Sequence, residues 1–191
     1  MPDDPFGGLR QVHAKIDAKF GAIAARHPAA IQCRLGCHSC CQPGLTVTAI
    51  EAAQIAQLLR DSPQAMAAAK AIAAQQPHQG MRCQFLDAEG ACVVYAARPA
   101  LCRSHGVPAW APPEMTGRGA TRKAVPERWD VCPLNFTRTD VTTLPDDRIA
   151  VQTVGALLLV VGEQWQQGST RRRVKLELAK ILAASTSLHR F

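Results

Sequence analysis

Residues 33–44 read CRLGCHSCCQPG, which places four cysteines within nine positions. Chance placement of so many thiols in so short a stretch is improbable, and four sulfur atoms on one side of a segment are poor core material. If the segment were helical, with about 100° per residue, the four side chains would lie within an arc of about 100°. A short helix or a tight turn here therefore predicts a platform of thiols for metal binding or redox chemistry.

Cys40 and Cys41 are adjacent, and we expect neighbouring side chains to diverge. One small tetrahedral ion would then not bind the two thiols together, so one of them belongs to a second metal, bridges two metals or stays free. The block also differs from the bacterial ferredoxin run, which spaces its cysteines more evenly and ends in Cys-Pro. That difference weakens an iron–sulfur interpretation and leaves it open.

Four further cysteines follow, none at a zinc-finger spacing. We expect the first block to recruit them, which predicts a set of metal ligands made of Cys33, Cys37, Cys40, Cys41, Cys83, Cys92, Cys102 and Cys132. Eight thiols are enough for two four-sulfur sites or for one cluster plus one ion, and the sequence does not divide them. For Cys132, which stands alone before Pro133, a role as a small buried hydrophobe is an equal alternative.

Other side chains near the cysteines are weaker candidates. His38 and His105 are possible metal ligands, although His38 lies between cysteines and would point off the platform. Tyr95, Arg98 and Arg103 either hydrogen-bond the thiolates or form ordinary surface contacts such as salt bridges.

The composition predicts one folded domain over residues 1–191, since 47% of the residues are hydrophobic and 19% are charged. The first residues, MPDDPFGGLR, do not resemble a secretory signal. The longest apolar run, residues 154–162, is shorter than the ~20 residues of a membrane span. We therefore expect a cytoplasmic protein without membrane contact, in which clustered thiols bind metal rather than form lasting disulfides.

The net charge of +7 is ambiguous, because thiolates at a metal centre would offset much of it. We therefore do not take the charge as a sign of nucleic-acid binding. The basic run at Arg171, Arg172, Arg173 and Lys175 is interpreted as the solvated start of a helix.

Apolar spacing predicts a first helix from Leu9 to Ile23, ended by Pro28. Thr48 and Glu51 have the spacing of a capping box, and the helix that follows should run to about Arg60. Ser62 and Pro63 then start an alanine-rich helix that closes at residues 75–77.

The rest of the chain is predicted to contain a hairpin or knuckle, a long irregular stretch and two further helices. Residues 83–95 are expected to form a short hairpin or knuckle with a turn at 87–90, and residues 104–145 a long irregular stretch. Residues 146–165 predict a buried helix. Residues 169–184 predict a last helix with Val174, Leu178, Ile181 and Leu182 on one face. The expected fold is mainly α: a small helical domain with an irregular metal-binding region at 33–105 and a helical part at 146–191.

The cysteine pattern resembles the YkgJ-type cysteine-cluster family, also called the CxxCxxCC domain. Its motif is a Cys-x2-3-Cys-x2-Cys-Cys block, then Cys-x-Phe-Leu, then Cys-x-x-Tyr-x-x-Arg-Pro-x-x-Cys-Arg. The residues that match it are Cys33, Cys37, Cys40, Cys41, Cys83, Phe85, Leu86, Cys92, Tyr95, Arg98, Pro99, Cys102 and Arg103. The resemblance covers about residues 33–105 and implies a zinc- or iron-chelating domain. Flagellin lysine methylases carry a similar motif associated with an iron–sulfur centre.

Three functions are compatible with these features. The first is a protein that holds zinc or iron, with an iron–sulfur cluster as one form of the iron, and serves metal handling, redox chemistry or scaffolding. The second is an iron-dependent enzyme that modifies a protein or peptide, although no phosphate-binding glycine loop and no paired carboxylates accompany the cysteines. The third is a zinc-stabilised nucleic-acid adaptor, for which one tyrosine and three tryptophans provide few stacking groups.

Overall fold

The computed structural model describes residues 4–75, 82–116, 123–166 and 173–186. Helices carry most of the ordered backbone in these ranges, and the strands have two or three residues each, so the fold is mainly α, as predicted. The elements in chain order are α1 (Gly7–Arg26), η1 (Pro28–Ala30), β1 (Thr46–Thr48), α2 (Ala49–Asp61), α3 (Pro63–Gln75), η2 (Tyr95–Ala97), α4 (Ala100–Ser104), β2 (Ala109–Ala111), β3 (Glu114–Thr116), β4 (Lys123–Val125), β5 (Arg128–Asp130), η4 (Val141–Thr143), β6 (Ile149–Ala150), α5 (Val151–Gln166), β7 (Arg173–Lys175) and α6 (Leu178–Thr186).

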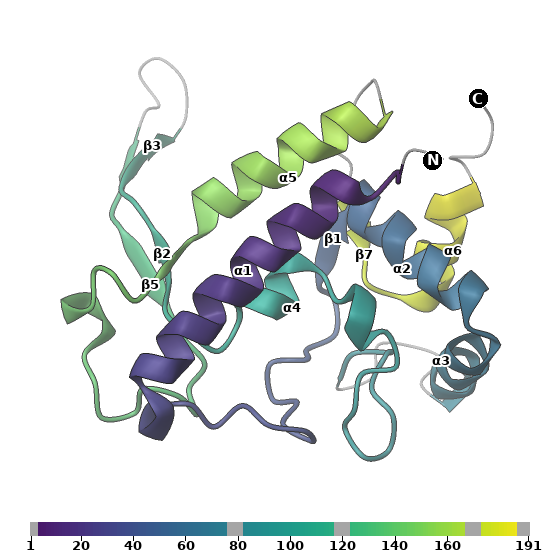
Figure 1. The fold of residues 1–191 in the computed structure, drawn as a ribbon, viewed down its shortest axis with the longest axis horizontal. Helices are drawn as coiled ribbons and strands as arrows, with labels where there is room; N and C mark the ends of the chain where they lie inside the picture. The colour runs from purple at the N-terminus through teal and green to yellow at the C-terminus, as the bar shows by residue number, and fades with distance from the viewer. Residues whose placement is uncertain (1–3, 76–81, 117–122, 167–172, 187–191) are drawn as a thin grey trace.

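Helices α1 and α5 lie side by side across the molecule (Figure 1). The predicted apolar positions of α1 are buried at Leu9, Val12, Ile16 and Ile23, because residues three and four apart share one helix face. Gly8 permits close packing, since a Cβ atom there would lie 3.2 Å from Cγ1 of Val161.

Helix α5 corrects the prediction of a buried helix at residues 146–165. It begins at Val151 instead, because Ile149 and Ala150 form strand β6. Only one side of α5 packs on the protein, and on the other side the side chains of Leu159 and Val160 are 40% and 50% exposed. An apolar sequence therefore does not mean burial on every face of this helix.

The helix predicted at residues 48–60 is confirmed, as is the helix that starts at Pro63. The last predicted helix is wrong in its first half. Residues 173–175 form β7, which pairs antiparallel with β1 and places Val174 opposite Val47. Of the described residues in this segment, those of α6 are helical, and Arg171 and Arg172 lie outside the described residues. The guanidinium of Arg173 donates to the carbonyl of Thr46 at 2.7 Å, so it belongs to a strand rather than to a helix start.

Two hydrophobic cores hold these elements. The first core consists of Val47, Ala52, Ile55, Ala56, Leu59, Ala69, Cys83, Phe85, Leu86, Val94, Ala97, Val174, Leu176, Leu178, Ile181 and Ala184. The second core consists of Leu9, Val12, Ile16, Ile23, Ile50, Ala100, Val107, Phe136, Ile149 and Leu158. Helix α2 contributes to both cores, because Ile50 and Ile55 face different neighbours.

The long stretch at 104–145 is less irregular than predicted. Strand β2 pairs antiparallel with β5 and parallel with β6, and β3 pairs antiparallel with β4. Such short strands carry too few alternating positions to give a periodic sequence signal. Among the described residues, no helix combines the length and the apolar character needed to cross a membrane.

Candidate metal centre

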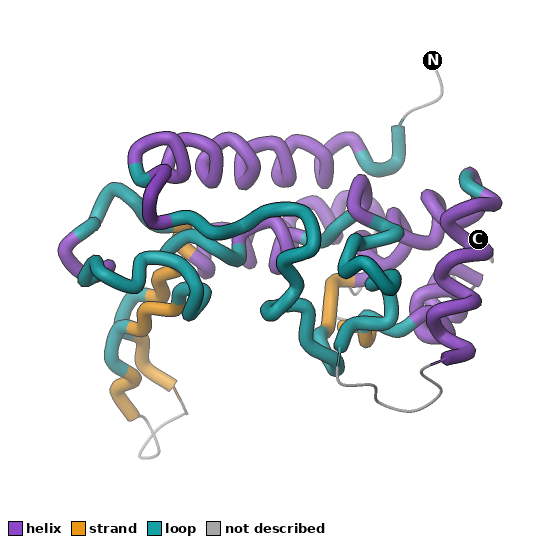
Figure 2. The backbone as a smooth tube through the Cα atoms, turned by 90° about the horizontal axis from the view of Figure 1, so that it is seen from below, coloured by secondary structure: helices purple, strands orange, loops and turns teal. Residues whose placement is uncertain are grey.

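The cysteines lie on three loops and one short helix. Residues 31–45 form the first loop and residues 82–94 the knuckle; both extend below α1 in Figure 1 and face the viewer in Figure 2. Helix α4 carries Cys102, and the loop after β5 carries Cys132. Segments far apart in the sequence therefore supply the thiols.

The first loop is a series of turns and not a helix, so the single helical face predicted for its cysteines is wrong. Gly36 has a φ of +83° and Gly44 a φ of +79°, whereas a helical residue needs a φ near −63°. Turns reverse the backbone beside the cysteines instead, since Cys37 donates its N–H to the carbonyl of Arg34 at 3.0 Å and Cys41 donates to His38 at 2.8 Å. The tight-turn alternative is the one that the fold adopts.

The predicted knuckle is present and contacts the first loop. Leu86 and Cys92 form an isolated antiparallel bridge around a turn in which Gly90 donates to the carbonyl of Asp87. The N–H of Cys83 donates to the carbonyl of Cys41 at 2.8 Å, which joins the two loops directly.

The turn of the knuckle also packs on the first loop. Gly90 has a φ of +79°, and a Cβ atom there would lie 2.6 Å from the His38 ring and 3.2 Å from the carbonyl oxygen of Gly36. A glycine is therefore required at residue 90 for both its backbone angle and the space it leaves.

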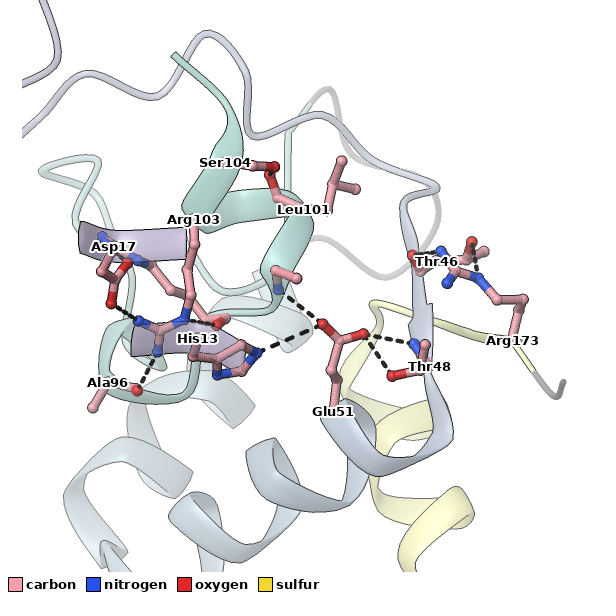
Figure 3. A network of polar contacts seen from close by, with 12 residues as sticks. His13, Asp17, Thr46, Thr48, Glu51, Ala96, Leu101, Arg103, Ser104 and Arg173 are labelled. Atoms are coloured by element: carbon pink, nitrogen blue, oxygen red, sulfur yellow. Dashed lines mark hydrogen bonds and ion pairs between the residues drawn. The ribbon is translucent and has the colours of Figure 1, made fainter. Parts of the chain in front are cut away.

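Helix α4 is placed by a buried carboxylate. Glu51 accepts hydrogen bonds from the N–H and the hydroxyl of Thr48, which confirms the capping box, and a further one from the N–H of Ala100 at 2.8 Å (Figure 3). The imidazole of His13 lies 3.8 Å from its Oε1 atom. Since Ala100 begins α4, Glu51 sets the position of the helix that carries Cys102.

Asn135 joins Cys132 to the first loop, and the sequence analysis missed it. Its side-chain amide donates to the Cys33 sulfur at 3.3 Å and to the carbonyl of Gly106 at 2.6 Å, while its oxygen accepts from the N–H of Gln32. Its own N–H donates to the carbonyl of Cys132 at 2.9 Å. No local motif marks this residue, although it is 98% buried.

Asn135 is held by its neighbour Phe136. The N–H of Phe136 donates to the carbonyl of Ala30, and its ring packs against His27 at a centroid distance of 5.4 Å. Phe136 has a φ of +54°, a region that residues with a side chain rarely adopt. The packing of its buried ring offsets that strain and fixes the loop beside Cys33.

The thiols influence one another electrostatically. Burial raises the pKa of Cys33, the hydrogen bond from Asn135 lowers it, and the nearby thiols of Cys132, Cys37 and Cys40 raise it. Neighbouring sulfur atoms have this effect because each disfavours a second negative charge close by.

Burial dominates for the thiols on the other side of the site. It raises the pKa of Cys83 to about 11 and that of Cys102 to about 12, and in Cys102 the nearby Cys83, Cys92, Cys40 and Glu51 add to the increase. These groups are protonated thiols in the metal-free chain. A metal ion bound here would have to displace their protons.

Cys40 and Cys41 do not diverge as predicted. Their side chains are hydrogen-bonded to each other, and this bond, followed by burial, raises the pKa of Cys40. The irregular backbone of the turn allows adjacent side chains to meet, which a regular strand would prevent.

All eight cysteines are free of disulfides. Cys33 is exposed, Cys83 and Cys132 are buried, and the rest are half-buried. Within the part of the chain that the structure describes, no three histidine, cysteine, aspartate or glutamate side chains are gathered closely enough to hold a metal ion. The loops place the thiols in one region without closing them into a coordination sphere, and the predicted ligand set stays a prediction. The donor chemistry suits zinc or iron, since both accept thiolate ligands.

Arg98 and Arg103 both contact Asp17, and Arg98 also stacks on Tyr95. The guanidinium of Arg98 contacts Asp17 at 3.2 Å and stacks on Tyr95 at 4.1 Å, and Arg103 donates to Asp17 and to the carbonyls of Arg98 and Ala96. Arg98 and Arg103 therefore form salt bridges, which is one of the two alternatives for them. Burial raises the pKa of Cys92, and the positive charge of Arg98 lowers it by a smaller amount.

His38 and His105, the two histidines predicted as possible ligands, lie on the first loop and directly after α4. The His38 ring lies against Gly90, and His105 forms an isolated bridge with Val107. Neither arrangement tests a ligand role, which stays a prediction for both.

A mainly helical fold with eight free thiols on three loops and one short helix defines a small cysteine-rich protein with the donor groups of a metal-binding domain. Residues 32–132 match the family model CxxCxxCC, whose description reads "Putative zinc- or iron-chelating domain". The match spans more than half of the chain, and the protein belongs to this family. It extends to Cys132, beyond the region of the sequence resemblance. No curated protein and no solved structure matches the chain.

Proposed function

We propose that this protein binds zinc or iron through the thiolates of its eight cysteines and serves in metal handling. The ligands would be Cys33, Cys37, Cys40, Cys41, Cys83, Cys92, Cys102 and Cys132. Redox chemistry and scaffolding are the other roles that such a centre supports, and an iron–sulfur cluster is one form that bound iron would take.

One observation carries the proposal: loops that are remote in the sequence are hydrogen-bonded to each other at the cysteines themselves. Cys41 accepts from Cys83, and Asn135, three residues after Cys132, donates to Cys33. Core packing alone does not require either contact to involve a cysteine. A metal that draws in side chains from these loops needs their backbones already close together.

Asn135, Glu51 and Gly90 would each support the proposed metal site. The Asn135 amide donates a hydrogen bond to a ligand sulfur, which stabilises its thiolate form. Glu51 holds the helix of Cys102, and Gly90 allows the knuckle to approach the first loop. The metal would supply the charge that keeps several thiolates together. We further propose a reducing compartment, the cytoplasm, since the thiols must stay reduced to serve as ligands.

The test is metal analysis of protein purified without oxygen from iron-replete cells, together with an absorption spectrum. Colour with stoichiometric iron supports an iron centre, and colourless protein with stoichiometric zinc supports a zinc centre. Protein that contains neither metal, and takes up neither when fully reduced, would overturn the proposal. A thiol–disulfide cycle in such metal-free protein would show a redox function instead.

A further inference from the structure

The eight cysteines separate into two groups when their backbone contacts and their packing are compared. One group is built around Asn135 and the other rests on the first hydrophobic core. The boundary between them runs between Cys40 and Cys41, because Cys41 packs against the first core.

The first group surrounds Asn135. The Asn135 amide contacts Cys33 at 3.3 Å and its backbone contacts Cys132 at 2.9 Å, so these two residues are joined through one buried side chain. A tight turn at Arg34 returns the chain so that Cys37 lies close to Cys33. Cys40 lies three residues further along the same loop, and it is assigned to this group because Cys41, and not Cys40, packs against the first core.

The residues that flank this group pack on the second core. Ile31 and Ala30 precede Cys33, Val131 precedes Cys132, and Phe136 follows Asn135; all four contact the second core. The residues on both sides of the group therefore pack on the same core.

The second group rests on the first core. Cys83 is a buried member of that core, and Cys41, Cys92 and Cys102 are the half-buried cysteines that pack against it. The N–H of Cys83 donates to the carbonyl of Cys41. The bridge between Leu86 and Cys92 holds Cys92 beside the segment that carries Cys83.

We infer that the thiols form two neighbouring four-sulfur metal sites: the Asn135 set of Cys33, Cys37, Cys40 and Cys132, and the core set of Cys41, Cys83, Cys92 and Cys102. Each set has the four ligands that a tetrahedral ion requires. This division rests on the proposed function and adds to it the number of metal ions and the assignment of every ligand. It also assigns Cys40 and Cys41, which are adjacent in the sequence, to different metal ions.

Cobalt(II) tests the division, because thiolate–cobalt bonds absorb light and report each equivalent that binds. The fully reduced, full-length protein should bind two equivalents, and native mass spectrometry of the zinc-loaded protein should show two zinc ions. A single equivalent in the unchanged protein would overturn the two-site division while leaving metal binding intact. No binding of either metal would overturn the proposed function as well.

Paired substitutions with the same number of thiols removed provide the decisive comparison. Cys33→Ser with Cys132→Ser should lose one equivalent and keep the other at unchanged affinity, as should Cys92→Ser with Cys102→Ser. The cross pair Cys132→Ser with Cys102→Ser takes one thiol from each set and should weaken both binding steps. A within-set pair that loses both equivalents, or a cross pair that keeps one at unchanged affinity, contradicts the assignment.

Single variants guard against misfolding of the pairs. Cys33 is exposed and Cys92 lies half-buried at the edge of the first core, so serine at either position replaces no fully buried side chain. Each single variant should weaken only one of the two cobalt-binding steps, and the steps affected should differ between Cys33→Ser and Cys92→Ser. If both variants weaken the same step, the division is wrong.

Discussion

The carboxylate of Glu51 accepts a hydrogen bond from the N–H of Ala100 at 2.8 Å, which joins the N-terminus of α2 to that of α4. Burial raises the pKa of Glu51, but the facing imidazole of His13 and the hydrogen bonds from Thr48 and Ala100 outweigh burial and hold the pKa below its usual value. The group is therefore an ionised acceptor between two helix ends, where a negative charge is stabilised.

Replacing Glu51 with glutamine should destabilise the protein by about 1–3 kcal/mol, because the amide nitrogen cannot accept the hydrogen bonds of buried donors. Urea unfolding at neutral pH measures the loss. Glu163→Gln is the matched control: it makes the same chemical change on an exposed face of α5, and it should alter stability by less than about 0.5 kcal/mol. Equal stability of the two variants would show that Glu51 does not join the helices.

Substitution of Asn135 by leucine should both destabilise the protein and lower its metal retention. It leaves the buried Gly106 carbonyl without its partner, at a cost of about 1–3 kcal/mol, and it removes the acceptor of the less buried Gln32 N–H. It also removes the donor to Cys33. Gln32→Ala is the control, since only the backbone of Gln32 contacts Asn135. The measurement is metal loss to a chelator over time, and equal rates in the two variants would remove Asn135 from the site.

Gly90→Ala should destabilise the protein by about 1–2 kcal/mol from the left-handed backbone angle, with a further loss from the shift of His38. Gly155→Ala is the opposite case, because a Cβ atom there meets nothing within 4 Å and the residue lies inside α5. Alanine at 155 should therefore stabilise the protein by about 0.5–1 kcal/mol. Thermal unfolding compares the two, and the same sign for both changes would contradict the structure.

Asp147 should make stability depend on pH in the acidic range. Its hydrogen bonds with Arg26 and then with His27 hold its pKa below the usual 3.8, so the folded protein releases the proton more readily than the unfolded chain. The resulting stabilisation is complete above pH 3.8 and is lost as the pH falls through the lower, folded pKa.

Asp147→Asn tests this dependence by urea unfolding between about pH 7 and about pH 2. The variant should be less stable than the unchanged protein at neutral pH, and the difference should shrink towards the acidic end. Asp146→Asn, at the neighbouring exposed residue, should show no such convergence. A difference that stays constant with pH would mean that the Asp147 charge does not matter.

Several elements were predictable because their signals are local. The apolar spacing of α1, the capping box of Thr48 and Glu51 and the turn of the knuckle each depend on residues close together in the chain. The predictions failed where packing outweighs local pattern. Val174 has an apolar spacing that fits a helix, yet it pairs with Val47 in a strand. The cysteines from 33 to 41 fit one helical face, yet Gly36 adopts a backbone angle that ends any helix.

The sequence by itself determined that this is a mainly helical, thiol-rich protein with a family motif for metal chelation, since helix periodicity and cysteine spacing are properties of short segments. Only the tertiary structure decided which thiols are neighbours. Asn135 reaches Cys33 across 102 residues, and two separate cores position the two sides of the site. Contacts of that range arise from the packing of whole elements, and no spacing along the chain encodes them.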